Sequence, residues 1–139
     1  MSIDELLLRY QAGERNFKGI NLIGGYLNGV DLSGVNLQGA SICEADLSQA
    51  VLAGADFTEA SLIGANLSGA DLRGANLSGA KLFEAKLTGA ILYGAKLKMA
   101  DLIDADFSAA ELAQANLYGA YLNGTNLEGA IMPDGTLHE

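Results

Sequence analysis

Residues that act as nucleophiles, bases or metal ligands are scarce in this chain of 139 residues. The only histidine is His138, and the only cysteine is Cys43. A serine or cysteine nucleophile needs an adjacent base held in a fixed geometry, and His138 lies next to the terminus. Zinc needs several cysteine and histidine ligands at close spacing, which this chain does not contain. We therefore expect no catalytic residue, no metal site and no enzymatic activity.

Glycine and acidic residues also fail to form a recognisable cofactor site. The glycines recur at intervals of five rather than in the GxxxxGK[ST] or GxGxxG patterns of phosphate-binding loops. Two pairs of carboxylates are close in sequence, Glu44 with Asp46 and Asp104 with Asp106. In the fold derived below all four point into water, where hydration leaves at most a weak cation site. We expect no bound cofactor.

The elements that position these residues follow from a five-residue period. From Phe17 to Leu127, every fifth position is Leu, Ile or Phe, for 23 consecutive repeats. The position two before is Ala without exception from Ala40 to Ala120, and the position two after is Gly in 15 of the 23 repeats. A short, unbroken period of this kind is typical of a solenoid.

A long helix does not fit this period, because five residues at 100° each scatter the Leu positions around the helix axis. In an extended segment, Ala and Leu two residues apart share one face. Two outward residues then follow in succession, so the chain must bend there, and Gly tolerates the positive φ of a tight turn. Each pentad is therefore one short strand and one corner around a Leu/Ala interior.

Like residues recur at intervals of 20, which favours four pentads per coil. One series is Asn28, Ser48, Ser68, Thr88 and Ser108. At the same interval, Lys81 with Asp101 and Lys86 with Asp106 lie one rung apart, and we expect them to form ion pairs between coils. Twenty-three pentads then make about six coils, or a rod roughly 25–30 Å long at about 4.8 Å per coil. The period leaves open whether corners without glycine keep the same turn, as at Glu44, Gln49, Glu84, Met99 and Ala109.

The run ANLSGADLRGANLSGAKL, residues 65–82, resembles the A(D/N)LxG consensus of the pentapeptide-repeat family. The resemblance covers about four-fifths of the chain. It implies an all-β fold, a right-handed quadrilateral parallel β-helix, and it implies little about activity. The opening RYQAGERNF and the closing GAIMPDGTLHE are similar to small members common in cyanobacteria.

We expect one domain over residues 1–139, with a helical cap at 2–13, a solenoid at 16–132 and a tail at 133–139. Ser2 to Glu5 has the pattern of a capping box, and Ile3, Leu6, Leu7 and Tyr10 form one apolar helical face. This helix is expected to cover the first coil.

At the other end, residues 133–136 form a turn signal, and Leu137 is expected to add a last apolar contact. A bare edge there is available to a second copy.

The net charge of −9 raises one specific alternative, imitation of DNA. Some members of the resembled family bind DNA gyrase in place of DNA. Duplex DNA carries about one charge per 1.7 Å, so a rod of this length needs on the order of 16 negative charges. Residues 16–132 hold 12 acids and 6 bases, and Lys81, Lys86, Lys96 and Lys98 interrupt the acidic surface. A DNA-mimicking regulator of an enzyme such as gyrase is therefore our second hypothesis.

One outward column is apolar over five successive coils, and we call it the apolar stripe: Ile23, Cys43, Ile63, Phe83 and Ile103. Aligned apolar side chains on a surface often mark an interface, although the β-propensity of Ile and Phe also explains them. Our first hypothesis is a non-enzymatic scaffold that binds protein, a second copy or another chain, through a face or an end.

Composition sets the expected compartment. A single cysteine rules out an internal disulfide and fits a reducing compartment. The first residues lack the basic and apolar segments of a signal peptide, and no apolar run is long enough to span a bilayer. We therefore expect a soluble cytoplasmic protein that binds neither membranes nor nucleic acid directly, with an oligomeric state that the sequence leaves open.

Overall fold

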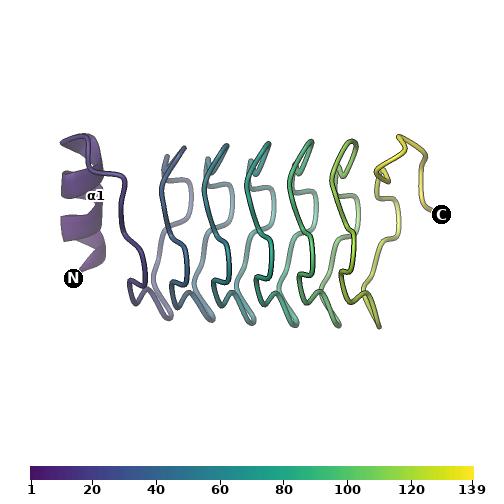
Figure 1. Ribbon diagram of the computed structural model, residues 1–139, viewed down its shortest axis with the longest axis horizontal. Helices are drawn as coiled ribbons and strands as arrows, with labels where there is room; N and C mark the ends of the chain where they lie inside the picture. Colours follow the sequence, from purple (N-terminus) through teal and green to yellow (C-terminus); the bar gives the residue numbers. More distant parts are fainter.

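The computed structural model covers all 139 residues and shows a stack of four-sided coils with one helix at its amino-terminal end (Figure 1). Parallel β-bridges join residues 20 positions apart, from Asn16 with Asn36 to Glu111 with Ile131. Four pentads per coil, as expected from the sequence, are therefore confirmed. Each bridge pairs one residue with one residue of the next coil. On each side of a coil only this one residue is paired, so no longer strand forms.

Four main-chain N–H groups per pentad set this register. In the pentad around Leu62, the N–H of Leu62 donates to Lys81 O at 2.7 Å, and that of Gly64 donates to Phe83 O at 3.0 Å. Ala65 closes the turn by donating to Leu62 O at 3.0 Å. Each coil thus supplies the acceptors for its neighbour, which is the requirement for buried main-chain groups.

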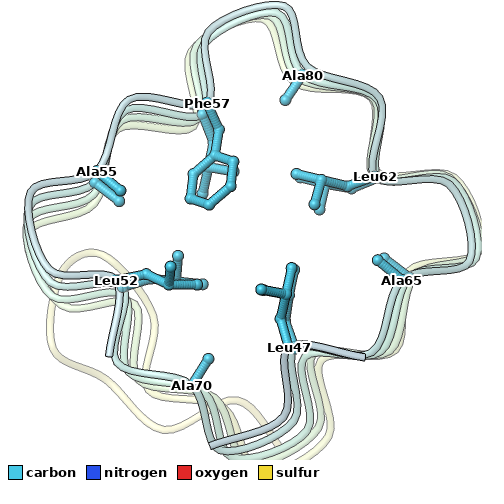
Figure 2. Packing of buried hydrophobic residues seen from close by; sticks show 14 of the residues in the cluster. Leu47, Leu52, Ala55, Phe57, Leu62, Ala65, Ala70 and Ala80 are labelled. Atoms are coloured by element: carbon cyan, nitrogen blue, oxygen red, sulfur yellow. The ribbon is translucent and has the colours of Figure 1, made fainter. Parts of the chain in front are cut away.

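Leu and Ala fill the interior from all four sides, as Figure 2 shows for Leu47, Leu52, Phe57 and Leu62. The core cluster contains 38 buried residues, and no polar or charged residue is buried. The expected inward positions are therefore confirmed. The interior has no room for a hydrated site, so any function belongs to the outer surface or to the ends.

Corners keep one backbone conformation whether or not glycine occupies them. Gly64 has φ of 68° and Glu44 has φ of 59°. The eight corner residues other than glycine all have positive φ: Glu44, Gln49, Glu59, Glu84, Met99, Asp104, Ala109 and Gln114. A left-handed conformation costs an L-residue about 1–2 kcal/mol. Corners without glycine therefore keep the same turn geometry as corners with glycine. The hydrogen bonds between coils hold these residues in the left-handed conformation despite its energetic cost.

The helix α1, Ile3–Gln11, covers the first coil. Ser2 caps it by accepting the N–H of Glu5 at 3.1 Å, and Gly13 follows its end with φ of 101°. Leu6 is fully buried, and the Tyr10 hydroxyl donates to Ser33 O at 2.7 Å. The expected capping helix is confirmed, and it closes the amino-terminal end of the core.

The opposite end is closed on one side only. Residues 132–136 turn back, so that Ile131 and Leu137 form an antiparallel bridge. The expected apolar contact of Leu137 is wrong, because 58% of this residue is exposed. The antiparallel pairing places Leu137 along the outside of the last coil rather than across its core.

Candidate functional site

The chemically reactive residues lie apart from one another on the surface. His138 is exposed in the tail, whereas Cys43 lies in the apolar stripe with its Sγ 3.1 Å from Ser61 Oγ. No group of three or more His, Cys, Asp or Glu residues is arranged to hold a metal ion. The four paired carboxylates, Glu44, Asp46, Asp104 and Asp106, are not buried.

The apolar stripe is one straight row, because its members occupy the same corner of successive coils. Ile23 is 58% exposed and Ile63 is 36% exposed, while Cys43, Phe83 and Ile103 are half-buried. Each side chain of the stripe therefore presents part of its surface to water.

At the outer position before the corner, main-chain N–H groups without an acceptor are more frequent along the stripe than on the other faces. In most pentads, an Asn or Asp accepts the N–H two residues later, as Asn66 does for Ser68 at 3.0 Å. Beside the stripe, Ser41, Ser61 and Lys81 replace Asn or Asp. The N–H groups of Cys43, Ile63 and Phe83 consequently have no acceptor in the protein, and they are available to a partner.

Three acidic corner residues form a second row along the stripe, and we call them the acidic row: Glu44, Glu84 and Asp104. Each directly follows a stripe residue in the sequence. The carboxylate of Glu44 occupies the space that a side chain at Gly64 would fill, and that of Asp104 does so at Gly124. Two side chains of the acidic row therefore lie along the rod, over corners of the next coil that carry glycine. No ion pair or hydrogen bond engages these carboxylates.

Sequence reasoning missed the acidic row, although its signal was present in the numbering. Residues 44, 84 and 104 fall in one column once the coil has 20 residues. The direction of their side chains along the rod was not predictable, because it depends on the corner φ that only the structure shows.

Two expected ion pairs do not form. The main chains of Lys81 and Asp101 pair between coils, as do those of Lys86 and Asp106, but no side-chain contact within 4.0 Å joins them. Asp101 Oδ1 instead accepts the N–H of Ile103 at 3.1 Å, and Asp106 Oδ1 accepts that of Ser108 at 2.9 Å. These local hydrogen bonds hold both carboxylates against their own corners and away from the lysines.

The carboxyl-terminal coil forms a partly open end. The N–H groups of Leu117, Leu122 and Leu127 have no acceptor, because no further coil follows on these three sides. Leu122 is 38% exposed, and Tyr118 and Tyr121 nearby are exposed as well. Like the apolar stripe, this end presents exposed apolar side chains together with main-chain N–H groups that lack an acceptor.

A shallow pocket of about 390 Å³ lies between α1 and the first coil, where Leu7, Tyr10, Gln11, Val30 and Asp31 line it. Two of its three polar side chains are already engaged, because Tyr10 donates to Ser33 O and Asp31 accepts the N–H and hydroxyl of Ser33, which leaves only the amide of Gln11. The pocket therefore offers no set of converging polar groups to a ligand.

The model of the pentapeptide repeats, in 8 copies, matches the sequence over residues 16–52, 44–79, 60–98 and 100–137. These matches cover most of the solenoid. The chain belongs to the pentapeptide repeat family. Members of this family form right-handed quadrilateral β-helices, in agreement with the coils described above.

Several solved pentapeptide repeat structures are similar to the chain. HetL from the cyanobacterium Nostoc sp. strain PCC 7120, involved in heterocyst differentiation regulation, is 29% identical (TM-score 0.39), with 99% of this chain and 100% of HetL covered. The protein alr5209 from Nostoc PCC 7120 is 35% identical (TM-score 0.45), with 91% and 95% covered. AT2G44920 from the thylakoid lumen of Arabidopsis thaliana is 28% identical (TM-score 0.46), with 93% and 73% covered.

These comparisons confirm the resemblance to cyanobacterial pentapeptide repeat proteins. A search of curated protein sequences returned no significant match. Pentapeptide repeat proteins are generally structural or interaction proteins rather than enzymes. The only helix, with nine residues, is too short to cross a membrane.

Aspartates of the repeats are stabilised in their charged form by the corner that follows. The Ser48 hydroxyl, at 2.6 Å, and the Ser48 N–H, at 2.9 Å, hold the pKa of Asp46 below its usual range. Ser108 lowers the pKa of Asp106 in the same way. A lowered pKa means that the folded state binds the proton more weakly than the unfolded state does.

We therefore expect acid to weaken the fold through these corners. The contribution of Asp46 and Asp106 is present above the unfolded pKa, about 3.9, and is lost as the pH falls through the lower folded value. The double variant Asp46→Asn/Asp106→Asn keeps an acceptor for each N–H, as Asn66 does. Urea titrations should show the unmodified protein to be more stable at neutral pH, with the difference decreasing as the pH falls through the lowered folded pKa of the two aspartates. A difference that stays constant with pH would refute this explanation.

Proposed function

We propose that this pentapeptide repeat protein is a non-enzymatic interaction module that binds a protein partner, another chain or a second copy, through a solenoid face or the open end. The observation that supports the proposal best is the apolar stripe. It aligns five apolar side chains on one face, and three of its rungs also have free N–H donors. The reactive residues, in contrast, do not converge on any site.

Partner capture from extracts of the producing cells tests this proposal. The tagged protein is compared with the double variant Ile63→Lys/Phe83→Lys and with Leu122→Lys at the open end. Lys occupies the same place in the repeat at Lys18 and Lys98, so the stripe variant should fold. We expect a partner, or a second copy, to be lost with one of the two variants. Capture and sedimentation that are identical for all three proteins would contradict the proposal.

The alternative, a DNA-mimicking regulator of an enzyme such as gyrase, is supported by the net charge of −9. Basic side chains weaken it, because each of the four faces carries at least one: Lys96, Lys81, Lys86 and Arg73. A continuous negative surface like that of DNA is therefore interrupted on every side. A gyrase supercoiling assay separates the two functions, since an interaction module of the first kind leaves supercoiling unchanged even at high excess.

We also propose a cytoplasmic location. The single cysteine supports it, because a protein without disulfides does not depend on an oxidising compartment. The family does not decide the matter, since one relative comes from a thylakoid lumen.

A further inference from the structure

Two rows run side by side along one face, and together they have the chemistry of a particular partner. The apolar stripe occupies the outer position before the corner, and the acidic row occupies the corner itself. The next residue of the stripe lies one coil away in each case, so both rows follow the long axis of the rod.

Acids at the corner position are concentrated on this face. The eight corner residues other than glycine include four acids, and three of them, Glu44, Glu84 and Asp104, follow stripe residues. The fourth, Glu59, lies at another corner. Each of these acids has positive φ, between 57° and 59°, in a place where glycine is the usual residue. The left-handed conformation of these acids is not offset by an interaction within the fold, because their carboxylates form no ion pair in the protein.

Spacing determines the secondary structure of a partner that fits the stripe. From Cys43 to Ile103 there are three intervals of about 4.8 Å, or roughly 14 Å. Positions i, i+3, i+7 and i+10 of an α-helix span about 15 Å at 1.5 Å per residue, so four helical side chains match four rungs. A strand laid along the stripe repeats its side chains on one face about every 6.7 Å and falls out of register.

We propose that this face binds a basic amphipathic helix, which lies along the rod with its apolar side chains on the stripe and its Lys or Arg side chains along the acidic row. This inference rests on the proposed interaction function and adds the class of partner. The acidic row repels nucleic acid and anionic membranes, whereas it attracts a helix with cations on one flank.

A designed peptide tests the complementarity directly. The probe is a labelled helical peptide with Leu at i, i+3, i+7 and i+10, with Lys along one flank and Gln elsewhere. A second peptide has Glu in place of each Lys. Fluorescence anisotropy with the full-length protein should show saturable binding of the Lys peptide and none of the Glu peptide, and binding should weaken as salt screens the charges.

Matched variants assign the binding to the two rows. The variant Glu44→Gln/Glu84→Gln/Asp104→Asn should weaken binding about tenfold, because three exposed ion pairs are lost. Glu59→Gln is its control, since Glu59 has the same corner conformation and lies over Gly79 as Glu44 lies over Gly64. Phe83→Ser should also weaken binding about tenfold. Its control is Tyr93→Ser, at the same place of the repeat on another face.

Each outcome bears on the inference. Loss with the row variants and unchanged binding with both controls supports it. No saturable binding of the Lys peptide, equal binding of the Glu peptide, or equal losses in variants and controls overturns it. If the peptide does not bind but partner capture from cells is still lost with Ile63→Lys/Phe83→Lys, the proposed function stands and only the helical, basic partner is refuted.

Discussion

Replacing Leu67 with Ala is expected to lower the free energy of unfolding by about 3 kcal/mol. Leu67 lies in a central coil, is fully buried and belongs to the single core cluster. Each coil contacts only its neighbours, so the surrounding rungs have little freedom to close the cavity without breaking their hydrogen-bond register. Urea unfolding followed by far-ultraviolet circular dichroism measures the loss.

The matched control is Leu122→Ala, at the same place of the repeat in the last coil. Leu122 is 38% exposed, and no coil lies beyond it, so its loss should cost less than about 1 kcal/mol. Equal destabilisation by the two substitutions would mean that the last coil is covered in solution, and it would contradict the open end described above.

Leu6→Asp is expected to detach α1 and to change the state of assembly. Leu6 is fully buried against the first coil, and a carboxylate there should cost about 3 kcal/mol or more. Release of the helix exposes the N-terminal edge of the solenoid while the C-terminal end is already open. Exposed edges pair with other chains, and two open ends allow head-to-tail growth. Sedimentation velocity should therefore show large species that the unmodified protein does not form.

Leu8→Asp is the control in the same helix, because Leu8 is 66% exposed and points away from the coil. It should leave both stability and sedimentation unchanged. A Leu6→Asp protein of unaltered size and stability would show that the helix does not protect the solenoid edge.

The solenoid was predictable in most respects because its period leaves few solutions. Leu at every fifth position and Ala two before it required one inward face, and the structure buries Leu67 and Ala65 accordingly. The capping helix was predictable from Ser2 and the apolar face that follows. The coil of four pentads came from weaker evidence, the similarity of residues 20 apart, and the β-bridges confirm it.

Side-chain direction was the part that the sequence did not determine. Asp106 was expected to pair with Lys86 one coil away, but its carboxylate bonds to the N–H and hydroxyl of Ser108. A hydrogen bond within one corner constrains fewer rotatable bonds than an ion pair between long side chains. The apolar contact expected of Leu137 was wrong because a turn signal in the sequence does not determine on which side of the last coil the tail returns.

The candidate surface was predictable in part. The apolar stripe follows from the numbering once the coil has 20 residues. The column of the acidic row follows from the same numbering, but the direction of its side chains required the structure, because Glu44 extends along the rod over Gly64 rather than outward.

The central claim is that residues 20 apart are neighbours on one face, and the native Cys43 allows a direct measurement. A second cysteine is introduced by Ile63→Cys, Thr58→Cys or Ser68→Cys, and a short bifunctional thiol reagent is added to dilute protein. Intramolecular cross-linking should be fast for Ile63→Cys, one rung of about 4.8 Å away, and slow for the other two, which lie on adjacent faces. Faster cross-linking with Thr58→Cys or Ser68→Cys would indicate three or five pentads per coil and would contradict the stripe itself.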